Sequence, residues 1–339
     1  MANLNIAILG LDRTSASMGL ALKRFTKKGG KHKFSIVGYD STSDNLKVAK
    51  KMGAVDKTET RLDNAVKDAD VVVMGVSYDE TEYAYRDIRS HLRDGVVILD
   101  LSPLKQPSLN WSDVYLTSEH HLVGMTATFN SRYLFDTKES LENAEEDLFD
   151  ESAILLTPAT ASAKEAVDLA FNFASIIGGK PRFLDPLEHD LLLAQTVQLP
   201  RLLGVTLFYD LMNKANWDDL KWLTNPDFGA LTRPLFDVHP DALRDEFHGN
   251  REALARVLDN YIETLSEVRD ALNSSDKDAI ETVAVDASVV YENWINSRHK
   301  GDWDAVAYSA DASKVNTGGM LQGLLGSTLA EKLSGKRDD

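Results

Sequence analysis

Short apolar runs alternate with amphipathic stretches over about the first 160 residues of the chain. Each run is short, mostly aliphatic and bounded by polar or turn residues, as buried strands are. We therefore predict strands at residues 6–9, 34–39, 71–76, 96–99, 122–125 and 154–156. Strands that alternate with helices are typical of a parallel, doubly wound α/β sheet of the Rossmann type.

The pattern changes from residue 186 onward to long helical periodicity with few β-branched clusters. Residues 251–272 and 279–298 carry apolar side chains three and four positions apart, which predicts helices whose apolar stripes serve in packing. The tail at 318–339 is glycine-rich and then charged, and we expect its last residues to be loose. Two domains follow: an α/β domain over residues 1–180 and an all-α domain over residues 181–339.

Composition narrows the class of protein and of partner. At 339 residues with 43% hydrophobic content, the chain can build one or two packed cores. It has no cysteine, no apolar run near the length of a membrane span and no signal-peptide pattern, so we expect a cytoplasmic protein without a membrane partner. Its net charge of -16 repels phosphate backbones and disfavours a nucleic-acid partner.

A tight turn between the first predicted strand and a helix start carries the candidate nucleotide site. Of the glycines of Gly-x-Gly-x-x-Gly only Gly10 is present, with Asp12 and Ser15 at the other two positions. Asp12 adds a negative charge where a diphosphate would sit, which Arg13 beside it could partly offset. The amides of the helix start still favour an anion. The cofactor-binding candidates are Gly10, Asp12, Arg13, Thr14, Ser15, Asp40 and Ser77.

Asp40 ends the second predicted strand, and its position bears on the choice of cofactor. An acidic residue there can accept both hydroxyls of an adenosine ribose and repels a 2′-phosphate. This favours NAD over NADP. The alternative is that Asp40 caps the turn at residues 41–44, because aspartate is common in turns.

The segment Asp185-Pro186-Leu187-Glu188-His189-Asp190, followed by Leu199-Pro200, resembles the prephenate and arogenate dehydrogenases of tyrosine biosynthesis. Further matches follow the family's order over roughly residues 4–300. They lie at Asp100 with Lys105, at Gly124, and at residues 155–158, 228–233 and 250–252. The resemblance implies a Rossmann domain, a helical domain that forms a homodimer, and an active site in the cleft between the two.

The resemblance also implies catalytic positions, not all of which keep the family's residue. Thr126 stands in place of a histidine that hydrogen-bonds the substrate hydroxyl, and a threonine cannot serve as a base near neutral pH. Gln198 stands in place of a second histidine and keeps hydrogen bonding without titration. A family serine falls one place from Ser102, whereas Lys105 is retained.

Arg233 matches the family's arginine for the substrate carboxylate, and its forked guanidinium suits a dicarboxylate. The alternative is an ordinary surface or interface arginine.

Three histidines, His120, His121 and His189, lie near these positions in the sequence. His120 and His121 precede a strand and are expected far from the strand ends where cofactors bind. We expect His189 and Asp190 to organise a helix start or to support the site from behind. Adjacent residues on one turn cannot all face one ion, so no metal site is expected.

The leading hypothesis is an NAD(P)-dependent dehydrogenase of the prephenate or arogenate type, in which the substrate's carboxylate leaves as carbon dioxide. One alternative is a dehydrogenase for another carboxylate-bearing alcohol. The other is a non-catalytic descendant that binds a nucleotide or metabolite, favoured by the changes at Asp12, Thr126 and Gln198.

Overall fold

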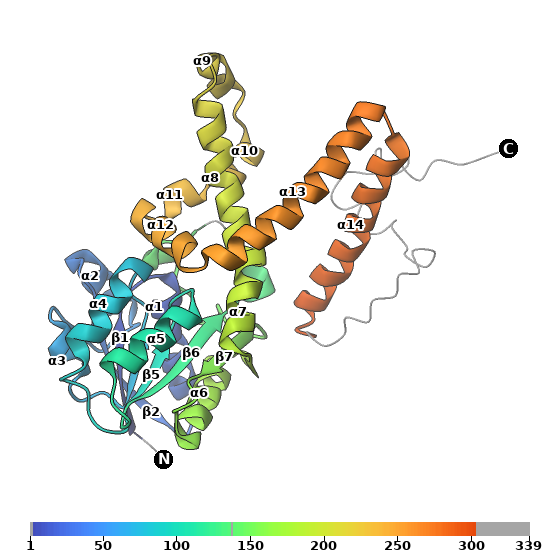
Figure 1. Ribbon diagram of the computed structural model, residues 1–339. Coiled ribbons are helices and arrows are strands. Elements are labelled where there is room, and N and C mark those ends of the chain that lie inside the picture. The colour runs from blue at the N-terminus through green and yellow to red at the C-terminus, as the bar shows by residue number, and fades with distance from the viewer. Residues whose placement is uncertain (1–2, 137, 303–339) are drawn as a thin grey trace. The chain divides into compact units, whose positions relative to one another are not determined.

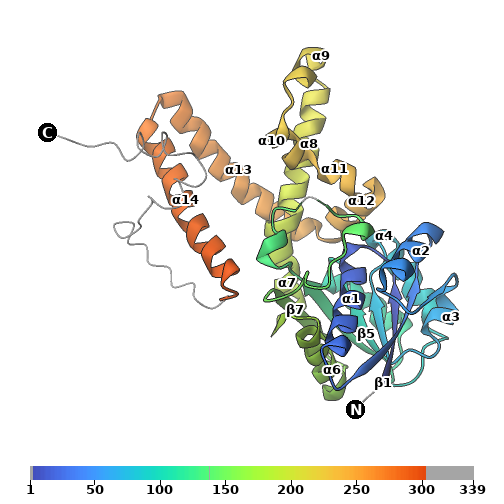
Figure 2. The same cartoon turned by 180° about the vertical axis from the view of Figure 1, so that it is seen from behind.

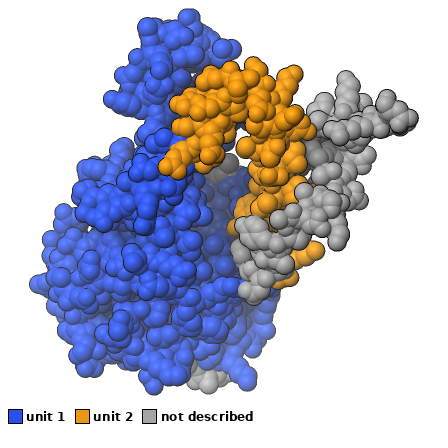
Figure 3. All heavy atoms as spheres, turned by 45° about the vertical axis from the view of Figure 1, so that its right-hand side comes forward, with its two compact units in different colours: residues 1–262 blue, residues 263–339 orange. Residues whose placement is uncertain are grey.

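The computed structural model describes residues 3–136 and 138–302. The chain divides into two compact units, residues 1–262 and 263–339, coloured separately in Figure 3. The tail at 318–339 lies outside the described residues, and the division into domains at residue 180 stays a prediction. Every candidate site residue belongs to the first unit.

One sheet of eight strands, in the order β3-β2-β1-β4-β5-β6-β7-β8, forms the centre of the first unit (Figure 1). The strands are β1 (Asn3–Leu9), β2 (Lys33–Tyr39), β3 (Lys57–Glu59), β4 (Val71–Met74), β5 (Val97–Asp100), β6 (His121–Ala127), β7 (Ala153–Pro158) and β8 (Lys180–Phe183). All neighbouring pairs are parallel except β6 and β7, which are antiparallel.

The six predicted strands are confirmed, with small shifts at their ends. β3 and β8 were not predicted, because both are short edge strands without a fully buried residue. A strand without a buried face shows none of the aliphatic pattern by which the others were found. The antiparallel pairing of β7 was also not expected.

Helices cover both faces of the sheet, as a doubly wound fold requires (Figures 1 and 2). One face is packed by α1 (Arg13–Lys27), α2 (Ser43–Met52) and α6 (Lys164–Ile176). The other is packed by α3 (Leu62–Val66), α4 (Tyr78–Ile88) and α5 (Lys105–Tyr115). Alternate residues of β1 therefore enter different cores: Ile6 and Ile8 the first, Ala7 and Leu9 the second.

The parallel strands β1, β4, β5 and β6 end at one edge of the sheet. Leu9 pairs with Met74, Met74 with Asp100, and Asp100 with Gly124. Thr126 follows two positions after Gly124, so it lies at the same carboxyl edge as the turns after β1 and β4. In α/β sheets this is the edge at which ligands bind.

The chain after β8 is helical among its described residues. The helices are α7 (Pro186–Leu193), α8 (Leu199–Met212), α9 (Trp217–Leu220), α10 (Pro226–Thr232), α11 (Pro234–Asp237), α12 (Pro240–Gly249), α13 (Arg251–Ser274) and α14 (Lys277–His299). The helices predicted at 251–272 and 279–298 are confirmed as α13 and α14. A π-helical turn, Ala194–Gln198, joins α7 to α8.

The helical run Pro186–Met212 is, among the described residues, long and apolar enough to be a candidate membrane span on length and composition alone. The sequence analysis did not expect such a run. A single run of this kind is weak evidence for insertion into a membrane. His189 and Asp190 in its first part are buried and hydrogen-bonded to β6 and α5.

Candidate active site

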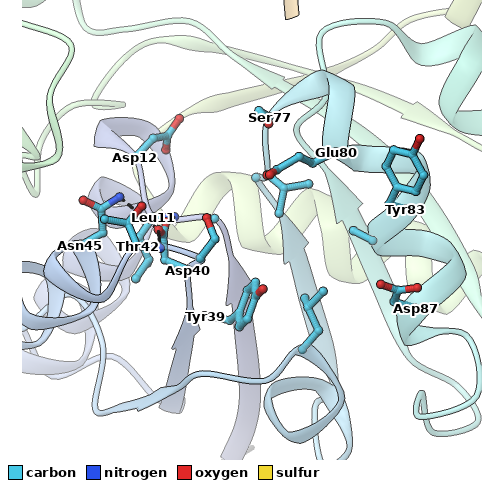
Figure 4. Close-up of a pocket in the computed structure, with 16 residues that line it drawn as sticks. Leu11, Asp12, Tyr39, Asp40, Thr42, Asn45, Ser77, Glu80, Tyr83 and Asp87 are labelled. Atoms are coloured by element: carbon cyan, nitrogen blue, oxygen red, sulfur yellow. Dashed lines mark hydrogen bonds between the residues drawn. The ribbon is translucent and has the colours of Figure 1, made fainter. Parts of the chain in front are cut away.

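A cavity of about 450 Å³ opens at the carboxyl ends of β1, β2 and β4 (Figure 4). It extends from the turn after β1 to the outer side of α4. The residues that line it are Gly10, Leu11, Asp12, Tyr39, Asp40, Ser41, Thr42, Asn45, Leu62, Gly75, Val76, Ser77, Glu80, Tyr83, Ala84 and Asp87. Four of the predicted cofactor-binding residues are among them: Gly10, Asp12, Asp40 and Ser77.

Gly10 allows the turn after β1 to lie against the turn after β4. Its φ of +82° is one that L side chains rarely adopt, and an added Cβ would lie 2.4 Å from the carbonyl oxygen of Gly75. The backbone of both turns is thereby exposed at the cavity, where a ligand can approach it. No other residue type fits this position without movement of the strand ends.

Asp12 caps the N-terminus of α1 and at the same time lines the cavity. Its carboxylate accepts a hydrogen bond from the Ser15 backbone at 2.7 Å, and the Ser15 hydroxyl accepts one from the Asp12 backbone at 3.0 Å. Solvent reaches the side chain, but the surrounding protein desolvates the carboxylate and raises its pKa, against the Ser15 hydrogen bonds that lower it. Ser15 is itself buried, and its hydroxyl donates to the carbonyl of Gly10.

Asp40 organises the turn after β2 and faces the cavity. Its Oδ2 accepts from the backbone N–H of Leu11 at 2.8 Å, and its Oδ1 accepts from the backbone N–H of Thr42 at 2.7 Å. The amide of Asn45 also donates to Oδ1, at 3.2 Å. The turn-capping role considered for Asp40 is therefore realised. A carboxylate has about four acceptor positions, so capacity for a further donor remains.

The cavity is acidic. Asp12, Asp40, Glu80 and Asp87 line it, and none of the described lining residues is a lysine or arginine. The negative charge in the cavity affects Tyr39. Desolvation and then the charges of Glu80, Asp40 and Asp87 raise the pKa of its phenol. An added phosphate monoester would therefore meet repulsion here, whereas hydroxyl groups would meet acceptors.

Arg13 does not line the cavity, although it was predicted to offset the charge of Asp12 there. Its guanidinium is buried, donates to the carbonyls of Asn143 and Lys138, and pairs with Asp136 at 2.9 Å. It also lies over the rings of Phe129 and Tyr133, 5.6 and 5.4 Å from their centroids. These partners of Arg13 all lie more than a hundred positions away along the chain, so the sequence could not reveal them. Thr14 is likewise outside the cavity lining.

A second group of polar side chains lies at the end of β6. The hydroxyl of Thr126 is 2.8 Å from Nε2 of His189, and Nδ1 of His189 is 2.9 Å from Oδ1 of Asp190. Thr126 is half-buried, whereas His189 and Asp190 are buried behind it. Burial and the charge of Lys105 lower the pKa of His189, against Asp190, which raises it.

Lys105, predicted to be catalytic, is enclosed in this region. Its ammonium donates to the carbonyls of Asp100, Ser102 and Met125 at 3.0, 2.6 and 3.1 Å. Its stem passes Gly124, where an added Cβ would lie 2.9 Å from the lysine Cδ. Burial lowers the pKa of Lys105 to about 8. The side chain ties β5 and α5 to β6 and does not project toward solvent.

Ser102 is buried beside the same strand ends. Its backbone N–H and its hydroxyl both donate to Oδ1 of Asp100, and the hydroxyl lies 2.6 Å from that of Ser108. The phenol of Tyr85 donates to the other oxygen of Asp100 at 2.6 Å. Ser102 thus belongs to a closed network around Asp100.

Gln198 ends the π-helical turn and is fully buried. Its amide donates to the carbonyl of Glu246 at 3.1 Å and its oxygen accepts from Asn250 at 2.7 Å. Asn250 also donates to the carbonyl of Asp190 at 2.8 Å, which joins Gln198 to the His189 group. π-helical turns are often found at functional sites.

Arg233 stands apart from this group. It lies between α10 and α11, and its Nε donates to Asp237 at 2.5 Å. About a third of its side chain is exposed, 32%. Its charge lowers the pKa of Glu139 on the loop that Arg13 also contacts, although desolvation raises that pKa more.

Comparison with known proteins bears on the identity of this site. Residues 20–182 match the family model described as prephenate dehydrogenase, nucleotide-binding domain. The chain is 24% identical over 275 residues to a prephenate dehydrogenase of Bacillus subtilis, which covers 80% of this chain and 71% of the relative. It is 24% identical over 285 residues to a cyclohexadienyl dehydrogenase of Zymomonas mobilis, which covers 81% of this chain and 90% of the relative.

Together these matches support the assignment of this chain to the prephenate and arogenate dehydrogenase family. Its fold agrees with a prephenate dehydrogenase of A. aeolicus that was solved with hydroxyphenyl propionate and NAD+, at a TM-score of 0.71 and 18% identity. The match covers 86% of this chain and 98% of that structure.

The structure brings together some of the catalytic residues that were predicted from the sequence. Thr126, Lys105 and Gln198 belong to one hydrogen-bonded region, joined through Asp190 and Asn250. His189 was expected to support the site from behind, and it lies buried behind Thr126, whereas the role of Asn250 was missed. Both lie in segments on which the resemblance rested, at 185–190 and 250–252, and that was the available signal.

Proposed function

We propose that the chain is an NAD-dependent dehydrogenase that oxidises the ring hydroxyl of prephenate or arogenate while the ring carboxylate leaves as carbon dioxide. One observation carries the proposal: the cavity after β1, β2 and β4 and the Thr126 hydroxyl lie at the same carboxyl edge of the sheet. A cofactor and a substrate hydroxyl can thus be held side by side there.

The residues of the cavity fit a dinucleotide except at Asp12, whose carboxylate opposes the charge of the diphosphate. The glycine turn at Gly10 lets a diphosphate approach the backbone, Asp40 suits the ribose hydroxyls, and Ser77 lies at the cavity wall. When bound, the nicotinamide supplies a hydride acceptor. Asp40 favours NAD over NADP, because a carboxylate that accepts from the ribose hydroxyls would repel a 2′-phosphate.

Five residues predicted to be catalytic are proposed to serve the substrate, either by contact or by positioning other residues. Thr126 would hydrogen-bond the substrate hydroxyl, and Arg233 would hold a carboxylate with the guanidinium that it now shares with Asp237. Lys105, Ser102 and Gln198 would act from behind the surface, by fixing the strand ends and α7. In this role they orient Thr126 and do not touch the substrate.

The test is turnover with prephenate or arogenate and with NAD or NADP, each in turn, followed by reduced-nicotinamide absorbance. We expect turnover with NAD that falls at least tenfold in Arg233→Ala, mainly through KM for the carboxylate substrate. Arg244→Ala, which removes an exposed arginine of α12, is the matched control. No turnover with any pair would exclude this function and leave another alcohol or a binding role.

We also propose a cytoplasmic homodimer formed through the helical part, residues 181–339. Large apolar side chains are exposed on α8 and the segments that follow it: Tyr209, Met212, Trp222, Leu223, Leu231, Leu235 and Phe236. A set of this kind on one part of a soluble protein supports an interface between copies.

A further inference from the structure

The hydrogen bonds behind Thr126 form a chain that leads from the half-buried end of β6 into the protein. Thr126 is the outermost member, His189 follows it, and Asp190 ends the chain. A ligand at the sheet edge would therefore meet the threonine hydroxyl before the imidazole. Thr126 cannot act as a base, but it is hydrogen-bonded directly to His189, which can.

The direction of these hydrogen bonds is set by Asp190. An ionised carboxylate only accepts, so Nδ1 of His189 carries the proton that Asp190 accepts. In the neutral ring Nε2 then holds a lone pair and accepts from the hydroxyl of Thr126. The backbone N–H groups of Lys105 and Gln106, at the start of α5, donate to Oδ1 and Oδ2 of Asp190 at 2.8 and 2.9 Å, so both carboxylate oxygens act as acceptors.

The charged groups around His189 also favour the neutral ring. Burial and the charge of Lys105 on α5 lower the pKa of His189, against Asp190 on α7, which raises it, so the pKa of His189 lies below the ordinary 6.5. Burial and then the charge of Asp190 raise the pKa of Tyr78 on α4, so this phenol remains neutral. At neutral pH His189 is thus free to accept a proton.

We propose that Thr126 passes the proton of the substrate hydroxyl to His189, which replaces the base expected at position 126. The inference rests on the proposed function. As the carbon–hydrogen bond breaks and its electron pair leaves as hydride to the oxidised nicotinamide, the substrate oxygen gives its proton to Thr126 Oγ1. The threonine proton passes to His189 Nε2 at the same time.

The remaining steps return the proton. The bond between the ring and its carboxylate breaks, carbon dioxide leaves, and the electron pair enters the ring. The ring oxygen, now phenolic, takes its proton back from Thr126, and Thr126 regains one from His189. His189 therefore holds a proton only transiently, and no proton is gained or lost overall.

The experiment compares four variants of the full chain: Thr126→Ser, Thr126→Val, His189→Asn and, as control, His120→Asn at the opposite edge of the sheet. The readouts are the pH profile of kcat/KM with NAD, and the nitrogen resonances of the His189 ring in the ligand-free protein. His189→Asn identifies those resonances by their loss.

We expect wild-type activity to fall as the pH drops below 6.5, where His189 gains a proton. Thr126→Ser keeps this profile, whereas Thr126→Val and His189→Asn lose about a hundredfold in kcat and lose the acid limb. The ring of His189 should be protonated on Nδ1 and free on Nε2 at pH 7. His120→Asn changes none of these.

Two results would overturn the relay while leaving the proposed function standing: turnover in His189→Asn with an unchanged acid limb, or a ring protonated on Nε2. A purely structural role predicts the first of these, because loss of packing lowers activity equally at every pH. Absence of turnover in the wild type would overturn the proposed function, and the relay as a catalytic device with it.

Discussion

The carboxylate of Asp190 on α7 accepts a hydrogen bond from the backbone N–H of Lys105 on α5, over 2.8 Å. The same carboxylate accepts from the Gln106 backbone and from His189. One buried side chain thus fixes the start of α5, the first helix after β8 and the ring that faces Thr126. Removing its charge should affect both folding and the site.

Asp190→Asn is expected to lower the free energy of unfolding by about 3 kcal/mol, because an amide cannot accept from all three donors and leaves at least one buried N–H without an acceptor. Urea unfolding measures this. Asp113→Asn, on the exposed side of α5, should change stability by less than about 0.5 kcal/mol. Equal effects of the two substitutions would contradict the assignment of Asp190 as the anchor.

Comparison of Gly10→Ala with Gly53→Ala separates the free-energy cost of backbone strain from that of steric overlap with a neighbouring turn. Gly10 and Gly53 share a φ of +82°, but an added Cβ meets Gly75 at Gly10 and open space at Gly53. We expect Gly53→Ala to cost about 1–2 kcal/mol from backbone strain alone. Gly10→Ala should cost about 3 kcal/mol or more and should abolish NAD binding. Thermal unfolding and calorimetric titration with NAD measure these, and similar losses in the two variants would contradict the close approach.

The sheet was largely predictable from sequence because its central strands are buried on both faces. Such strands must be aliphatic throughout, and runs such as Val71–Met74 show this directly. β3 and β8 were not predicted because edge strands are constrained mainly by backbone pairing, which restricts the type of side chain only weakly.

The candidate site was predictable only where a residue acts through its neighbours in sequence. Gly10 and Asp40 are examples, since each turn follows its strand directly. The partners of Arg13 and His189 were not predictable, because Asp136 and Thr126 lie far along the chain. For such residues, only the folded chain reveals which polar group meets which.

Asp40→Asn tests the preference for NAD. We expect KM for NAD to rise about tenfold, since a charged acceptor for the ribose is lost. KM for NADP should fall, because the carboxylate proposed to lie at the ribose no longer repels the 2′-phosphate. Asp87→Asn removes a carboxylate of the same cavity at α4 and should leave the ratio of the two nearly unchanged. A melting temperature near that of the wild type must accompany the comparison, since Asp40 also holds Leu11 and Thr42.

Lys105 makes stability depend on pH in the alkaline range. Burial lowers its pKa from 10.5 to about 8, so between these values the unfolded chain binds a proton that the folded chain has lost. Stability must then rise with pH, by about 1–2 kcal/mol between pH 8 and 9.5. Above pH 10 the raised pKa values of Tyr78 and Tyr85 oppose this. Urea unfolding should show the rise in the wild type and in Lys164→Met but not in Lys105→Met, and a rise that persists in Lys105→Met would assign it elsewhere.

The exposed apolar side chains after α8 give the last prediction. Trp222 and Phe236 are 82% and 88% exposed. Large apolar side chains exposed together to water do not stabilise a monomer and are typical of an interaction surface. If a second copy covers them, the double variant Trp222→Ser/Phe236→Ser should raise the dimer dissociation constant at least tenfold, since large aromatic side chains dominate interfaces. Val114→Ser, at an exposed position of α5, is the control. Sedimentation velocity over a concentration series distinguishes the outcomes, because an unchanged dimer would place the interface on another surface and a monomeric wild type would exclude it.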